Sequence, residues 1–341
     1  MHHDQPAGDE SRLARQRCEG LSRREPQLIA TPEPPRSATP FRDAEDVAAQ
    51  LATVGYFADD TTATAIHLMT ALERPLLVEG PPGVGKTSLA RCLAQVSQRP
   101  LVRLQCHEGI DDARALYEWD YTRQLLATQL ARADPTGQTG QADSGGTGSS
   151  VSLGALFDES FLLERPLLTA IRSPEPVVLL IDEVDRADEA FDALLLEVLD
   201  EQQVTIPELG TITATSTPWV VLTSNETREV ADALKRRCLR IAVDYPTPER
   251  ELEIVTNAVP GVAAALAQRV VEALASLRSV ALHQPPGSAE AIEWARALLV
   301  LGADDLDERT IEQTLATIVK HSRDEAAVRN VLIPDAPRPD R

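Results

Sequence analysis

The string Gly80-Pro81-Pro82-Gly83-Val84-Gly85-Lys86-Thr87 constrains this chain more than any other feature of its 341 residues. It fits the pattern G-x-x-x-x-G-K-[ST], and it stands between an apolar run at 76–78 and a helical stretch at 88–96. Glycines let the backbone wrap around a phosphate with its N–H groups pointing inward, and the N-terminus of the following helix adds positive potential. We therefore expect a phosphate-binding loop, with Lys86 reaching the β and γ phosphates and the Thr87 hydroxyl binding Mg²⁺.

A second feature is a pair of carboxylates at the end of an apolar run. Residues 177–181 read Val-Val-Leu-Leu-Ile and lead directly into Asp182 and Glu183. Acid at the carboxyl end of a parallel strand lies where the ligands of open sheets bind. We predict that Asp182 holds a magnesium ion, directly or through water, and that Glu183 polarises the attacking water. A solvated helix start is the usual role of such a pair, and it is the phosphate loop that favours hydrolysis here.

Two further features are open to two interpretations each. Asn225 ends the apolar run at 219–224, where an amide can orient the lytic water and sense the γ-phosphate, although a turn asparagine is its commoner role. Arg236 and Arg237 belong to a cationic cluster in a chain otherwise short of such clusters. Either the cluster complements the dipole at the end of its own helix, or one planar guanidinium stabilises charge on the transferring phosphoryl group.

The order of the apolar runs predicts the fold class, α/β. Short runs bounded by turn signals, each followed by a helical pattern, indicate a parallel sheet covered on both faces. These runs lie at 76–78, 101–104, 177–181 and 219–223. From Tyr245 onward the pattern is helical only, and Pro248 suits the first position of a helix. We predict an α/β nucleotide-binding domain at 44–245, followed by a helical lid domain at 246–330.

Three segments have a composition that does not form a core. Residues 1–43 hold five prolines between Pro26 and Pro40, and residues 133–150 form a tract rich in Gly, Ser and Thr. Such segments bury too little apolar surface to offset the entropy of ordering them. We predict a disordered arm at 1–43, a flexible insert at 133–150 inside the α/β domain, and a disordered tail at 331–341.

The composition of the chain disfavours several classes of protein. The chain carries 53 acidic and 33 basic side chains, a net charge of −20, and this disfavours binding to nucleic acid. Its apolar runs are too short for a membrane span, and its four cysteines show neither a disulfide framework nor a zinc-site spacing. The first residues contain no apolar export signal, so we expect a cytoplasmic protein.

The phosphate loop, acid pair, polar strand end and arginine cluster, with a helical domain after them, resemble the AAA+ ATPases over about residues 44–325. Within that superfamily, residues 78–87, 203–207 and 222–229 resemble the MoxR group. The strings at 116–121, 161–168, 285–287 and 293–296 more narrowly resemble the CoxD-type branch. That branch is associated with maturation of carbon monoxide dehydrogenase and with partners that carry a von Willebrand factor A domain.

This resemblance implies a P-loop NTPase αβα sandwich followed by a small all-α lid. It implies ATP and Mg²⁺ as cofactors, Asp182 and Glu183 as the Walker B pair, and Asn225 as sensor 1. The implied finger offered to a neighbouring subunit is Arg237, with Arg236 second, and a finger in trans requires an oligomer. The nucleotide-binding positions are Gly80, Pro81, Pro82, Gly83, Val84, Gly85, Lys86, Thr87, Ser88 and Asp182, with Thr87 and Asp182 as the metal ligands.

Such ATPases form rings, usually hexamers, in which the nucleotide state moves the lid against the core. One departure concerns the lid: Glu290 stands where many MoxR proteins carry a sensor 2 arginine, and Arg296 is a possible substitute about two turns further on. Three aromatic residues within five positions, Tyr117, Trp119 and Tyr121, either grip a client polypeptide or fill the core.

The expected function is that of a MoxR-type ATPase that remodels or matures a partner metalloenzyme, a molybdenum hydroxylase such as carbon monoxide dehydrogenase. A nucleotide-gated assembly scaffold, which has no need of Glu183, is an alternative, as is a general MoxR chaperone for another complex linked to a von Willebrand A protein. A GTPase-like switch is disfavoured because no N-K-x-D string occurs, and a DNA motor is disfavoured by the net charge.

Overall fold

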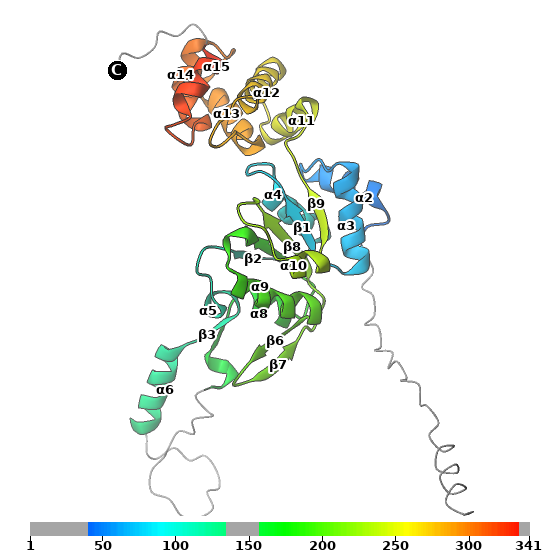
Figure 1. Ribbon diagram of the computed structural model, residues 1–341, viewed down its shortest axis with the longest axis vertical. Helices are drawn as coiled ribbons and strands as arrows, with labels where there is room; N and C mark the ends of the chain where they lie inside the picture. Colours follow the sequence, from blue (N-terminus) through cyan, green and yellow to red (C-terminus); the bar gives the residue numbers. More distant parts are fainter. Residues whose placement is uncertain (1–39, 134–156, 334–341) are drawn as a thin grey trace, which may run out of the picture. The chain divides into compact units, whose positions relative to one another are not determined.

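A parallel sheet of five strands lies at the centre of the α/β region in the computed structural model, which describes residues 40–133 and 157–333 (Figure 1). All four predicted strands are confirmed, and a fifth, β9, was not predicted. The strand order is β2-β5-β8-β1-β9. The bounds are β1 (Leu76–Glu79), β2 (Leu101–Gln105), β5 (Val178–Asp182), β8 (Trp219–Ser224) and β9 (Leu239–Ala242).

Helices cover both faces of this sheet, as the continuous apolar runs predicted. In β5 every residue is buried, and alternate side chains enter two separate cores: Val178 and Leu180 one, Leu179 and Ile181 the other. The first core is completed by α2 (Ala44–Thr53), α3 (Asp60–Leu72) and α4 (Lys86–Ser97). The second is completed by α8 (Pro166–Arg172), α9 (Glu189–Leu196), which continues as a π-helix at Glu197–Glu201, and α10 (Asp232–Arg237).

Two antiparallel pairs extend from the α/β region. One is the hairpin of β6 (Gln203–Ile206) and β7 (Gly210–Thr213), whose first strand lies in the segment 203–207 that the sequence predicted as part of a hairpin. The strands β3 (Tyr117–Trp119) and β4 (Leu162–Glu164) form the other pair, next to α5 (Asp112–Ala115), α6 (Tyr121–Ala133) and a 3₁₀ turn at Glu159–Phe161. Trp119 is buried and packs edge-on against Phe157 at 5.3 Å, whereas Tyr121 is 66% exposed at the start of α6. The aromatic cluster is therefore split between core and surface.

The C-terminal region consists of helices only, as predicted. They are α11 (Pro248–Ala258), α12 (Ala264–Arg278), α13 (Ser288–Leu301), α14 (Glu308–Ile318) and α15 (Glu325–Leu332). Their own core surrounds Trp294, which is fully buried and whose indole N–H donates to the Thr314 hydroxyl at 2.8 Å. Among the helices of residues 40–133 and 157–333, none has the length and apolarity that crossing a bilayer requires.

The ordered unit is longer at both ends than the composition predicted. Phe41 is buried and stacks on Trp219, and the Asp43 carboxylate accepts from the Asp46 backbone N–H at 2.8 Å to cap α2. At the other end Ile333 packs into the helical core after α15. The predicted ends of the ordered region, at 43 and 331, were wrong by a few residues. Burial of one large apolar side chain at each end, Phe41 and Ile333, orders the polar residues beside it. Residues 1–39 and 334–341 and nearly all of the predicted insert lie outside the described residues.

A buried ion pair joins three helices of the lid. Arg278 donates to both carboxylate oxygens of Glu251, at 2.7 and 2.6 Å, and the Ser288 hydroxyl donates to the same carboxylate at 3.0 Å. The side chains are 12% and 1% exposed, so neither charge is well hydrated.

We expect Arg278→Met to lower the free energy of unfolding by about 3–5 kcal/mol, because it leaves the Glu251 carboxylate buried and unpaired. Urea denaturation measures the loss. The double variant with Glu251→Leu should recover most of it, since no charge then remains buried. A loss of less than about 1 kcal/mol, typical of an exposed pair, would mean that water reaches the carboxylate.

Candidate active site

The loop between β1 and α4 has the backbone conformation that a phosphate cradle needs. Gly80, Gly83 and Gly85 have φ values of 149°, 81° and 99°, in the region that favours glycine. A Cβ atom at Gly80 would lie 1.9 Å from the Val243 carbonyl oxygen, so no larger residue fits there. Gly85 is the N-cap of α4 and has no side chain with which to cap it. The first N–H groups of α4 are therefore available to an anion.

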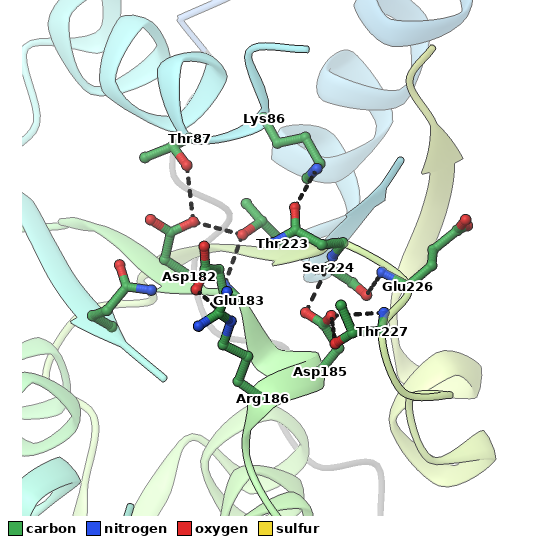
Figure 2. A network of polar contacts seen from close by, with 12 residues as sticks. Lys86, Thr87, Asp182, Glu183, Asp185, Arg186, Thr223, Ser224, Glu226 and Thr227 are labelled. Carbon is green, nitrogen blue, oxygen red and sulfur yellow. Dashed lines mark hydrogen bonds and ion pairs between the residues drawn. The ribbon is translucent and has the colours of Figure 1, made fainter. Parts of the chain in front are cut away.

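The Lys86 side chain points toward the end of β8, where Figure 2 labels Thr223 and Ser224, and it contacts Asn225 there. The Lys86 ammonium donates to the carbonyl oxygens of Gly80 and Pro81 at 2.6 and 2.7 Å and to Asn225 Oδ1 at 2.8 Å. These contacts use all three of its donors. Burial lowers the pKa of Lys86, an effect that the nearby carboxylates partly offset. The ammonium is thus held in the loop by groups that a phosphate can replace.

The predicted metal ligands also converge. The Thr87 hydroxyl donates to Asp182 Oδ1 at 2.9 Å, and the Thr223 hydroxyl donates to the same oxygen at 2.6 Å. The Asp182 side chain is 3% exposed and its other oxygen accepts from Arg103. A hydroxyl and a carboxylate are the oxygen ligands that Mg²⁺ prefers. Thr87 and Asp182 therefore fit the ion that the sequence predicted.

Glu183 lies next to them in an uncommon backbone conformation. Its φ of 57° is in the left-handed region, and its backbone N–H donates to the Thr223 hydroxyl at 2.9 Å. Non-glycine residues adopt this conformation at a cost of about 1–3 kcal/mol, and such strain is concentrated at functional positions. The Glu183 carboxylate pairs with Arg186 at 3.0 Å.

Asp185 was not predicted, and it organises the loop that carries Asn225. Its carboxylate accepts from the backbone N–H groups of Asn225 and Thr227 at 3.1 and 2.9 Å and from the Thr227 hydroxyl. Burial alone would raise the pKa of Asp185, but these hydrogen bonds outweigh burial and lower it. Its only sequence signal was its place three residues after Asp182, which does not reveal a partner 40 residues away.

The arginine cluster lies apart from this network. Arg237 pairs with Asp200 at 2.9 Å and donates to the Ala233 carbonyl at 3.0 Å. Arg236 is exposed, and its guanidinium has no ion pair or hydrogen bond among residues 40–133 and 157–333. Arg74 donates to the carbonyl oxygens of Arg236 and Arg237 at 2.9 and 3.3 Å, which fixes the end of α10.

A cavity of about 810 Å³ contains the loop, the acid pair and Asn225. Tyr56 from the segment before α3, together with Ile254 and Ile292 from the lid, adds apolar surface to its lining. A lining that combines polar groups able to bind phosphate with apolar side chains suits a nucleotide. Arg250 of α11 also lines the cavity and donates to the Ala58 carbonyl at 3.4 Å. It is the cationic lid residue that sequence reasoning missed.

The two lid positions considered from the sequence have other roles. Glu290 accepts from the Gly287 backbone N–H at 2.8 Å and thus caps α13. Arg296 donates to the Ala258 carbonyl at 3.3 Å and is not among the residues that line the cavity. The lid instead touches the loop through its backbone, because the Ser288 N–H donates to the Gly83 carbonyl at 3.2 Å.

Comparison with known proteins finds a family similar to the central part of the chain. Residues 75–238 match the family of the AAA domain, dynein-related subfamily, and this span contains the loop, Asp182, Glu183, Asn225 and the arginine pair. Over these residues the α/β part of the chain is similar to an AAA domain, a kind of domain that binds nucleotide.

The relatives and the solved structures share less than 30% of their residues with this chain. The chain is 24% identical over 285 residues to an uncharacterized protein of Staphylococcus haemolyticus, covering 80% of this chain and 95% of the relative. It is 27% identical over 193 residues to one of Staphylococcus aureus, covering 55% of this chain and 62% of the relative. The Thermotoga maritima RuvB Holliday junction branch migration motor is 18% identical, covers 83% of this chain and 72% of its own, and has a TM-score of 0.40.

Proposed function

We propose that this chain is an ATPase that hydrolyses ATP with Mg²⁺ in the cavity described above. The observation that carries the proposal is the direct contact of two side chains at the start of α4 with two at the ends of β5 and β8: Lys86 with Asn225, and Thr87 with Asp182. A structural loop has no need of a buried ammonium beside a buried carboxylate, whereas phosphoryl transfer needs both.

Each residue has a defined task in this proposal. The loop amides and Lys86 bind the β and γ phosphates, while Thr87 and Asp182 hold the metal ion, which supplies charge neutralisation at the phosphates when bound. Glu183 orients and polarises the attacking water, and Asn225 contacts the γ-phosphate and that water. Burial strengthens all of these interactions because the local dielectric is low.

We propose that the active form is a ring, with a finger arginine donated by the neighbouring subunit. Neither Arg236 nor Arg237 lines the cavity of its own chain, so such a guanidinium has to come from another copy. Between the two, Arg236 is favoured, since Arg237 is already paired with Asp200. A hexamer is the expected size from the resemblance to AAA+ ATPases.

We further propose that the ATPase remodels a partner metalloenzyme, with a von Willebrand factor A protein as co-partner. The support is the resemblance of residues 116–121 and 161–168 to the CoxD-type branch of the MoxR group. The nucleotide-gated scaffold remains the alternative. Affinity purification of an ATP-locked variant from the native cell, followed by mass spectrometry, tests the client: a molybdenum hydroxylase is the expected companion, and its consistent absence would favour another complex.

The test of the nucleotide site is Lys86→Ala. We expect binding of a fluorescent ATP analogue to weaken by about a hundredfold or more, because each charge-assisted hydrogen bond to phosphate contributes roughly 1.5–3 kcal/mol and two would be lost. Lys320→Ala is the matched control, since Lys320 pairs with Glu293 on the lid surface. Equal affinity of the two variants would contradict the proposed site.

A further inference from the structure

The buried carboxylate of Asp182 already has a cationic partner, which comes from the edge strand β2. Arg103 donates to Asp182 Oδ2 through Nη2 at 2.6 Å and through Nε at 3.2 Å, and its Nη2 also contacts the Gln105 side chain. In the pairing of β2 with β5, Gln105 lies opposite Asp182. Arg103, two residues before Gln105, lies on the same face of β2 as Gln105. No sequence pattern indicates this pair, since its members are 79 residues apart.

This contact completes the coordination of the carboxylate. Oδ1 accepts from the Thr87 and Thr223 hydroxyls, and Oδ2 accepts two N–H groups of Arg103. A carboxylate offers about four lone-pair sites, and all are in use. A divalent cation held by Asp182 would have to compete with this guanidinium for the charge of the carboxylate. Lys86 does not compete for Asp182, because its three donors are directed to the loop and Asn225.

The two partners differ in their freedom to move. The Asp182 side chain is 3% exposed at the end of a central strand, whereas the Arg103 side chain is 41% exposed on an edge strand. The arginine can therefore turn into solvent, while the carboxylate cannot. A carboxylate buried in this way needs a cation at all times, since an unpaired buried charge is strongly unfavourable.

We propose that Arg103 is the counter-ion of Asp182 in the nucleotide-free protein, and that Mg²⁺ displaces it when nucleotide binds. Arg103 then sets how much Mg²⁺ the protein needs, and the α/β core stays neutralised between rounds of nucleotide exchange. A guanidinium remains charged at any physiological pH, so the exchange is a competition between cations. The link to nucleotide binding rests on the proposed function, whereas the competition between Arg103 and Mg²⁺ for Asp182 does not.

A purely structural role for Arg103 predicts the opposite change in Mg²⁺ affinity when the residue is removed. If Arg103 is a permanent strut that orients Asp182 toward the metal, its removal weakens Mg²⁺ binding. If Arg103 is a counter-ion, its removal strengthens Mg²⁺ binding, because the ion no longer has to displace a bound charge. The direction of one measured shift therefore separates the two.

The experiment is an Mg²⁺ titration of Arg103→Gln at a fixed concentration of fluorescent ATP analogue. We expect the midpoint to fall about tenfold relative to the wild type, within the range of coupling found for hydrogen-bonded charge pairs. Arg240→Gln is the matched control, since Arg240 pairs with Glu79, another buried acid at the end of a neighbouring strand, away from the metal ligands. Its midpoint should stay that of the wild type. An unchanged or higher midpoint for Arg103→Gln overturns the proposal.

A second readout needs no nucleotide. Without Mg²⁺ the melting temperature of Arg103→Gln should fall below that of the wild type, and MgCl₂ alone should restore it, whereas the wild type should respond little. Arg103→Lys retains a point charge and should give intermediate values if the glutamine variant folds poorly. Absence of nucleotide binding by the wild type would refute the proposed function, while the MgCl₂ response would still decide the counter-ion role: no response in either variant overturns it.

Discussion

Replacement of Glu183 by glutamine is expected to lower ATP turnover by about a hundredfold to ten-thousandfold, the range of a positioned general base. The amide cannot polarise water as a carboxylate does, yet the loop, Lys86, Thr87 and Asp182 remain in place. Nucleotide affinity should therefore stay within a few-fold of the wild type. Steady-state phosphate release measures the first quantity, and titration with a fluorescent ATP analogue measures the second.

This substitution also separates the motor from the scaffold. Glu189→Gln is a suitable control, because Glu189 lies in the first turn of α9 and does not line the cavity. If wild-type turnover, measured with and without a candidate partner, does not exceed that of Glu183→Gln, the chain binds nucleotide without using it as fuel. The scaffold would then be the better description.

The second large effect concerns the arginine pair. We expect Arg236→Ala to lose turnover by about a thousandfold or more, as for arginine fingers elsewhere, with ATP affinity nearly unchanged. Mixing this variant with Glu183→Gln should restore part of the activity, because some interfaces then combine an intact acid pair with an intact finger. Such rescue occurs only if the guanidinium acts across a subunit boundary.

Arg237→Ala is the natural comparison for that experiment. Arg237 is paired with Asp200, so its removal should lower stability more than turnover. The reverse result, with turnover abolished by Arg237→Ala and preserved by Arg236→Ala, would assign the finger to Arg237 and require its pair with Asp200 to break on assembly. Full activity of both variants, or a chain that stays monomeric with ATP, would contradict a shared site.

The parts of this site that were predictable depend on local patterns. A loop rich in glycine after an apolar run specifies its own backbone. Strand ends of a parallel sheet meet at one edge, where Asp182 and Asn225 were expected to face the nucleotide. The strand β9 was missed because it is short and includes a charged residue, Arg240, among its four positions. Its place beside β1 depends on the sheet as a whole.

The residues that were missed share a different property. Arg103, Asp185 and Arg250 act through partners that are distant in the sequence, and each belongs to a residue type that is ordinarily solvated. Likewise, in the described part of the chain Arg237 is paired and Arg236 is not, because Asp200 lies next to Arg237. Asp200 belongs to a π-helical turn, which the spacing of apolar residues in the sequence does not predict. Such pairings become visible only once the backbone has brought the partners together.

The contact between Gly83 and the start of α13 has a consequence for how motion begins. A Cβ atom at Gly287 would lie 2.6 Å from the Gly83 carbonyl oxygen, so the two main chains touch with no side chain between them. We expect a displacement of the loop by bound triphosphate to reach the helical domain through this backbone contact. The contact does not depend on an arginine side chain of the lid, and it requires glycine at both positions.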